Sequence, residues 1–177
     1  MTAASPACSF RPARRGRARR SALAAVVASA ALALAALVPG RAAADAWGSL
    51  KGRIFVSDAE FGGGYGSDAA MVAAVKKQSK AAIKGSAGWT LNLMVFLKEA
   101  AGADKINIVY YDVSGKKREQ VNYSEVAVKP EQKIVQLNGI AISPDLGFVK
   151  GHKYDVLATR LIGGKEKVYA KAVVTLK

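Results

Sequence analysis

His152 is the only histidine in the 177-residue sequence, so acid–base chemistry by an imidazole has a single candidate. A histidine base needs a nucleophile and an orienting acid nearby, and Ser143 and Asp145 are the candidates closest along the chain. Because His152 stands between Gly151 and Lys153, a solvated or locally hydrogen-bonded turn residue is the simpler interpretation. One histidine also excludes the histidine-rich sites that zinc and copper usually need. We therefore predict no catalytic histidine and no bound cofactor.

Carboxylates that lie close together in the chain offer a different chemistry, the binding of a hard cation. Asp58 and Glu60 are two residues apart, and Asp68 follows beyond a glycine-rich stretch. Calcium binds carboxylate and carbonyl oxygens of this kind. The spacing does not match the twelve-residue calcium loop, however, and a basic domain is a poor electrostatic host for a cation. We predict no metal site.

Carboxylates from separate strands could instead serve a small exported hydrolase. Such an enzyme needs acids that converge in one pocket and have shifted pKa values, and the chain offers Asp112, Glu125 and Asp155. No spacing in the sequence brings these three together. A hydrolase is therefore the alternative to our main interpretation, which is a protein that is not an enzyme.

Four lysines mark a candidate binding face. Lys76, Lys77, Lys80 and Lys84 fall on one side of a helix predicted over about 68–84. Such charge runs are usually solvated. The sharper hypothesis is contact with an anionic surface, such as lipid headgroups or acidic polysaccharide, supported by Lys98 or by the basic turn at 116–118.

A glycine-rich loop over 61–66 is a second candidate contact region. It superficially suggests a phosphate-binding loop, but it lacks the Gly-Lys-Ser/Thr ending and the βαβ setting of such loops. An exposed flexible loop is the better interpretation. Because Phe61 and Tyr65 are interleaved with glycines, we predict that these two aromatic residues contact a partner.

The elements that must position these residues are mostly strands. Short apolar runs separated by turn residues favour an antiparallel sandwich or barrel. A helical insertion interrupts them, with Ser67 or Asp68 as its N-cap and Gly85 at its end. The seven predicted strands cover residues 50–56, 89–97, 106–113, 120–128, 134–142, 154–162 and 167–176.

Residues 144–156, PDLGFVKGHKYDV, carry a family resemblance. The stretch resembles the turn into the sixth strand of immunoglobulin-like and fibronectin-type-III sandwiches, and Tyr154 looks like their tyrosine-corner residue, whose hydroxyl reaches back to the backbone. The two disulfide cysteines and the core tryptophan of antibody domains are absent. The resemblance thus implies an all-β, seven-stranded antiparallel sandwich without a disulfide, and it carries no function.

The N-terminal 44 residues have the order of an export signal. Six arginines precede an uncharged segment over 21–38, followed by Pro39-Gly40 and an alanine run that ends at Ala44. Cleavage after Ala44 would leave residues 45–177 as one domain, without Cys8, and would lower the net charge from +14 to +7 because seven arginines and no acids are removed. We predict a periplasmic or secreted protein, or a membrane-anchored one if the signal is not cleaved.

Together these patterns predict an exported, non-catalytic binding or structural module of the cell envelope. Its basic character favours an anionic envelope polymer, or another envelope protein, as partner. Export argues against nucleic acid. The apolar side of the predicted helix is mostly alanine, which is too weakly hydrophobic for stable membrane insertion after cleavage. A further alternative is a subunit of an envelope assembly that pairs through a strand edge at 50–56 or 167–176.

Overall fold

The computed structural model describes residues 46–177. The predicted signal segment, residues 1–44, and its cleavage point lie outside this range. Within the described residues, no helix has the length and apolar character needed to cross a membrane.

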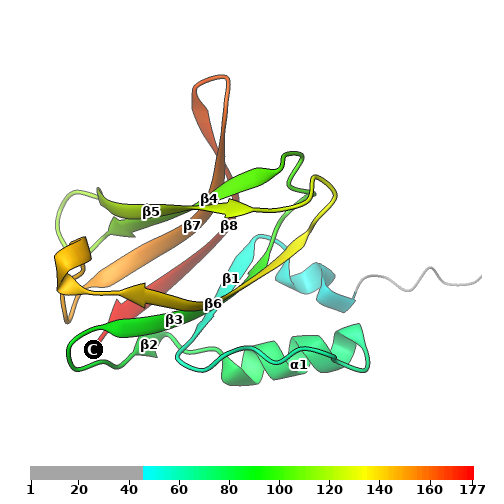
Figure 1. Cartoon of the computed structure of the whole chain (residues 1–177), viewed down its shortest axis with the longest axis horizontal. Coiled ribbons are helices and arrows are strands. Elements are labelled where there is room, and N and C mark those ends of the chain that lie inside the picture. The colour runs from blue at the N-terminus through cyan, green and yellow to red at the C-terminus, as the bar shows by residue number, and fades with distance from the viewer. Residues whose placement is uncertain (1–45) are drawn as a thin grey trace, which may run out of the picture. The chain divides into compact units, whose positions relative to one another are not determined.

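One mixed sheet of eight strands forms the body of the domain and curls into a half-barrel (Figure 1). Seven strands follow one path in the order β5-β4-β7-β8-β1-β3-β6, and β2 pairs with β8 beside this path. The strands are β1 (Arg53–Ser57), β2 (Ala82–Ile83), β3 (Trp89–Phe96), β4 (Lys105–Asp112), β5 (Glu119–Ala127), β6 (Ile134–Ile142), β7 (Lys153–Ile162) and β8 (Lys165–Leu176).

The predicted immunoglobulin-like or fibronectin-type-III-like sandwich is wrong. A sandwich needs two sheets, whereas here every strand belongs to one sheet. The sheet is also not purely antiparallel, because β8 pairs in parallel with β1, at Arg53↔Lys171, and with β2. The seven predicted segments do contain strands, but their arrangement differs and the two-residue β2 was not predicted.

Bulges give the sheet the curl that lets a single layer enclose a core. The register shifts between Leu91 and Leu93 in β3, at the β4–β5 pair, and between Ala158 and Thr159 in β7. Each bulge bends its strand and increases the local twist. The concave face therefore closes over a cluster that includes Leu93, Ile108 and Tyr154.

The bulge in the β7–β8 pair turns two consecutive side chains of β8 toward the core. Strict alternation puts Tyr169 on the face opposite Ala170. In the structure both side chains are buried in the main core, because the register skips Tyr169 between Ala170 and Val168. Tyr169 also donates a hydrogen bond from its hydroxyl to the carbonyl of Ala101, at 3.2 Å.

A second cluster covers the other face of β1 and β3. Phe55, Met94 and Phe96 pack there against the helix α1 (Asp68–Gln78) and the 3-10 helix η1 (Ala46–Leu50). Ser67 caps α1 by accepting a hydrogen bond from the Ala70 N–H, at 3.2 Å. The helix ends at Gln78, before the predicted end near residue 84, because the following residues enter β2. A second 3-10 helix, η2 (Pro144–Leu146), lies between β6 and β7.

Candidate functional site

The strand register brings several distant loops to one end of the half-barrel. Asp112 at the end of β4 pairs with Tyr154 at the start of β7, which pairs with Val174 near the end of β8. The end of β2 joins the same edge through the pair Ile83↔Leu176. The β2–β3, β4–β5 and β6–β7 connections therefore meet near the C-terminal end of β8 (Figure 1).

Exposed lysines gather at this end, which we call the basic end. They come from the three connections, from the first residue of β7 and from the residue after β8. Within residues 46–177 none of them forms an ion pair. The acids of this end are Asp112, which pairs with His152, Asp155, which pairs with Arg118, and the exposed Glu119 and Asp145. The six lysines of the basic end are Lys84, Lys116, Lys117, Lys150, Lys153 and Lys177.

The surface of the basic end has two shallow hollows. Lys84, Lys150 and Lys177 border one of about 450 Å³, together with Ser86. The second, of about 380 Å³, is bordered by Lys116 and Lys117 together with Asp112, Glu119 and His152. Ammonium groups offer three hydrogen-bond donors each and no acceptor, so these hollows suit phosphate, sulfate or carboxylate groups.

An aspartate–histidine pair braces the second hollow. Asp112 Oδ2 lies 2.6 Å from His152 Nδ1, and Asp112 Oδ1 accepts a hydrogen bond from the Ser114 N–H at 2.8 Å. Burial opposes ionisation of Asp112, but the hydrogen bonds from His152 and Ser114 outweigh it and lower the pKa of the carboxyl. The Ser114 hydroxyl in turn accepts from the Lys153 N–H at 2.7 Å. The β4–β5 turn is thus fastened to the start of β7.

The catalytic set imagined around His152 is not assembled. No hydrogen bond in the described part of the chain joins His152 to Ser143 or Asp145, and the imidazole is bound to Asp112 instead. Sequence distance concealed this partner, which lies 40 residues away. Only the antiparallel pairing of β4 with β7 brings the two residues together.

Of the acids proposed for a hydrolase, Asp112 and Asp155 lie on neighbouring strands at the basic end, whereas Glu125 lies far from both. Asp112 and Asp155 are each tied to a different basic group, His152 and Arg118. Glu125 forms an ion pair, at 2.6 Å, with Lys105, the first residue of β4. Glu125 faces Asn107, which precedes Asp112 by five positions along β4, and at ~3.4 Å per position the two places are about 17 Å apart. These acids therefore form no common pocket.

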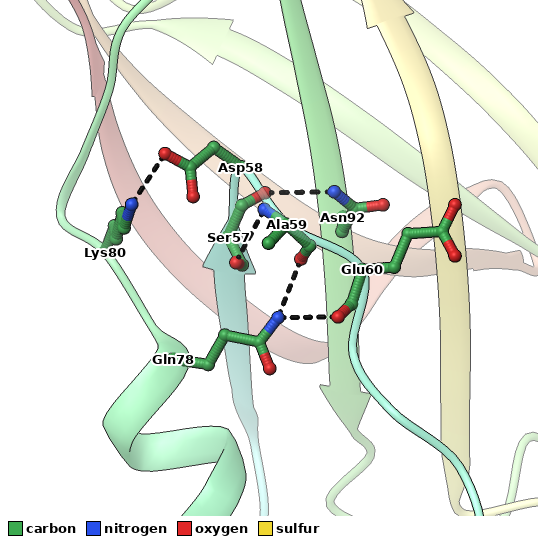
Figure 2. A network of polar contacts seen from close by, with 7 residues as sticks. All are labelled: Ser57, Asp58, Ala59, Glu60, Gln78, Lys80 and Asn92. Atoms are coloured by element: carbon green, nitrogen blue, oxygen red, sulfur yellow. Dashed lines mark hydrogen bonds and ion pairs between the residues drawn. The ribbon is translucent and has the colours of Figure 1, made fainter.

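The predicted lysine face is divided among three places. Lys76 and Lys77 lie exposed in the last turn of α1. Lys80 lies beyond the helix and pairs with Asp58 at 2.6 Å, a contact that lowers the pKa of this carboxyl (Figure 2). Lys84 belongs to the basic end.

A polar network fastens the segment after β1 to the end of the helix (Figure 2). Gln78 Nε2 donates to the carbonyls of Ala59, at 2.9 Å, and Glu60, at 2.6 Å. The Ser57 hydroxyl accepts from the Ala59 N–H at 3.0 Å. Glu60 thus takes part through its backbone carbonyl, and Asp58 faces Lys80. Among the described residues, no group of three or more acidic, histidine or cysteine side chains could hold a metal ion.

The glycine-rich loop has a buried anchor at its start. Phe61 is 2 % exposed and belongs to the second cluster, and its carbonyl accepts a hydrogen bond from Gln136 Nε2 at 2.8 Å. Its side chain is therefore used in packing within the domain. Tyr65 is half-buried, with a hydroxyl that has no hydrogen-bond partner among the described residues.

The local contact expected of Tyr154 is present in spite of the different fold. Its hydroxyl accepts a hydrogen bond from the Val149 N–H at 2.6 Å. Tyr154 packs against Phe148, which in turn meets Tyr110 edge-on at 5.4 Å between ring centroids. This contact holds the β6–β7 connection, and with it Lys150, against the core.

The strand edges proposed for assembly are interior strands of the sheet. β1 lies between β8 and β3, and β8 lies between β7 and β1. Both have neighbours on each side, so neither offers a full edge to another chain. The path ends instead at β5 and β6.

Comparisons with protein-family models, with curated proteins and with solved structures give no match for this chain.

Proposed function

We propose that this protein is a non-catalytic module that binds anionic polymers through the basic end. The observation that carries this proposal is the convergence of six exposed lysines from separate parts of the chain, none in an ion pair with another described residue. With the export signal predicted for residues 1–44, the module would act at the cell envelope.

Unpaired surface lysines favour anionic partners through long-range attraction. Charges at a protein surface are screened over about 10 Å at 0.1 M salt, so binding should weaken steeply as salt is added. Lysines separated across two hollows would engage several anionic groups at once. A polymer with repeated anionic groups therefore suits this end better than a single small anion.

Two adjacent-lysine pairs allow a matched test. Lys116→Glu/Lys117→Glu reverses two charges at the basic end, and Lys76→Glu/Lys77→Glu makes the same charge change on α1. The lysines of both pairs are exposed and lie outside the core. We expect the first double variant to elute from a heparin column at clearly lower salt than the native protein, and the second to elute close to it.

The matched pair also separates the competing explanations. Weakened retention of the α1 variant alone would assign binding to the helix face and overturn the proposal that the basic end binds the polymer. An equal loss in both variants would mean that only the net charge matters. Circular dichroism of each variant checks that the sheet is intact.

A further inference from the structure

The face of the sheet opposite the main core carries a hollow of about 370 Å³ over β4, β5, β7 and the β7–β8 hairpin. Along β4, Ile106, Ile108 and Tyr110 point into the core. Asn107, Val109 and Tyr111 alternate with them and border the hollow, as the period of two requires. We call this hollow the outer groove. Its size is within the range of ~300–1,000 Å³ typical of ligand sites.

Aromatic and aliphatic side chains form part of the outer groove. Tyr123 is 61 % exposed and Leu161 is 65 % exposed, and both border this hollow, so apolar surface gathers there. Tyr111 and Val109 lie beside them. Two tyrosines in one groove present flat, rigid surfaces with polar tips, a combination that suits ligands with both apolar and polar parts.

The remaining lining is rich in hydrogen-bonding groups and poor in charge. Asn107 and Gln120 supply amides, Thr159 a hydroxyl and Glu166 a carboxylate, so donors and acceptors are mixed and one group is ionisable. The Tyr111 hydroxyl lies 3.3 Å from Glu166 Oε1. A sugar ring has C–H faces that pack on aromatic rings and hydroxyl edges that need such mixed donors and acceptors. A lipid chain would leave these polar groups unpaired.

Arg118 connects the outer groove to the basic end. Its guanidinium lies 3.8 Å from the centroid of the Tyr111 ring and 3.4 Å from Asp155. Lys116 and Lys117 immediately precede it in the β4–β5 turn. A polymer that leaves the groove at this side meets the basic end directly.

We propose that the outer groove binds sugar rings of an acidic polysaccharide, whose anionic groups engage the basic end. This inference rests on the proposed function and deepens it, because it names the class of polymer. It distinguishes an acidic polysaccharide from anionic polymers without sugar rings, such as polyphosphate or an acidic peptide.

Two probes of equal charge test this inference, a hexagalacturonate oligosaccharide and a hexaglutamate peptide. Both carry one carboxylate on every repeating unit, but only the oligosaccharide has sugar rings. By isothermal titration at fixed ionic strength we expect the native protein to bind the oligosaccharide at least tenfold more tightly. Tyr123→Ala should reduce oligosaccharide affinity about tenfold, equivalent to 1.4 kcal/mol, and leave peptide affinity unchanged. Tyr123→Phe, which keeps the ring, should retain most of the preference.

The outcomes separate this inference from the proposed function. Equal affinity of the native protein for the two probes, or unchanged oligosaccharide binding by Tyr123→Ala, would overturn the saccharide groove. If Lys116→Glu/Lys117→Glu then weakened binding of both probes, the proposed function would stand without it. Conversely, Tyr123→Ala could lose oligosaccharide binding while Lys116→Glu/Lys117→Glu changes nothing. That result would support saccharide binding by the outer groove and overturn anion binding by the basic end. No binding of either probe by the native protein would overturn both.

Discussion

Asp112 Oδ2 lies 2.6 Å from Nδ1 of His152, so one side-chain pair joins the end of β4 to the loop before β7. The same carboxylate accepts the Ser114 N–H, and the Ser114 hydroxyl accepts the Lys153 N–H. Three hydrogen bonds therefore fix the relative positions of the two segments that carry Lys116, Lys117 and Lys153. The pair thereby braces the basic end.

This brace predicts an acid-sensitive contribution to stability. The folded-state pKa of Asp112 is below its ordinary value of 3.8, so the ionised carboxylate stabilises the fold above pH 3.8 and loses this effect as the pH falls through the folded-state pKa. Asp112→Asn should lower the free energy of unfolding by roughly 1 kcal/mol at pH 6, and the difference from the native protein should shrink below pH 4. Thermal unfolding between pH 2 and 6 measures it. Asp145→Asn, at an exposed acid of the same end, is the control, and a pH-independent difference for Asp112→Asn would contradict the prediction.

Two core tyrosines should respond in opposite ways to removal of the hydroxyl. Tyr110 is 2 % exposed and its hydroxyl has no hydrogen-bond partner among the described residues, whereas that of Tyr154 accepts the Val149 N–H. A buried unpaired hydroxyl is unfavourable, and its burial raises the pKa of Tyr110. We expect Tyr110→Phe to be neutral or to stabilise by up to ~1 kcal/mol, and Tyr154→Phe to destabilise by about 1 kcal/mol. Urea unfolding compares them; destabilisation by Tyr110→Phe would show that its hydroxyl is bonded.

Two glycines of the β6–β7 connection form a further matched pair. Gly147 and Gly151 both have φ of +87°, where any side chain is strained. A Cβ at Gly147 would also lie 3.0 Å from Val121 Cγ1, while at Gly151 it would meet nothing within 4 Å. Both alanine variants should be destabilised, by about 1 kcal/mol for the backbone strain, and Gly147→Ala should lose more. Equal unfolding midpoints would mean that Val121 moves aside without cost.

The sequence indicated where the strands lie but not how they close over a core. Alternation is what a strand with one buried face requires, and in β4 the alternating residues Ile106, Ile108 and Tyr110 do lie in the core. A strand that faces a second sheet has the same alternation as one in a single sheet that curls over itself. The bulges that produce the curl, such as the one at Tyr169, leave no mark in a pattern of period two. The parallel pair of β1 with β8 joins residues 118 positions apart, for which local turn signals carry no information.

The candidate site could not be predicted from the sequence either, because residues far apart in the chain come together there only in the folded sheet. Lys84 and Lys150 border one hollow although 66 residues separate them. Helical spacing grouped Lys84 with Lys76 instead, but the helix ends at Gln78. Tyr111 and Tyr123 share the outer face because Tyr123 pairs with Val109, two residues before Tyr111. The register shift between Tyr110 and Tyr111 then makes Gln120, not Val121, the partner of Tyr111, so that Gln120 also borders the outer groove.

Arg118 provides the sharpest test of the link between the groove and the basic end. Lysine at this position would keep the positive charge but lose the planar group that stacks on Tyr111 and pairs with Asp155. We therefore expect Arg118→Lys to leave heparin retention nearly unchanged and to lower the preference for hexagalacturonate over hexaglutamate about threefold, a loss of ~0.7 kcal/mol typical of an exposed cation–π contact. If heparin retention fell together with the preference, the guanidinium itself would contribute to general anion binding, because lysine keeps the charge. An unchanged preference would separate the groove from the basic end, because the stacked guanidinium is the contact that joins them.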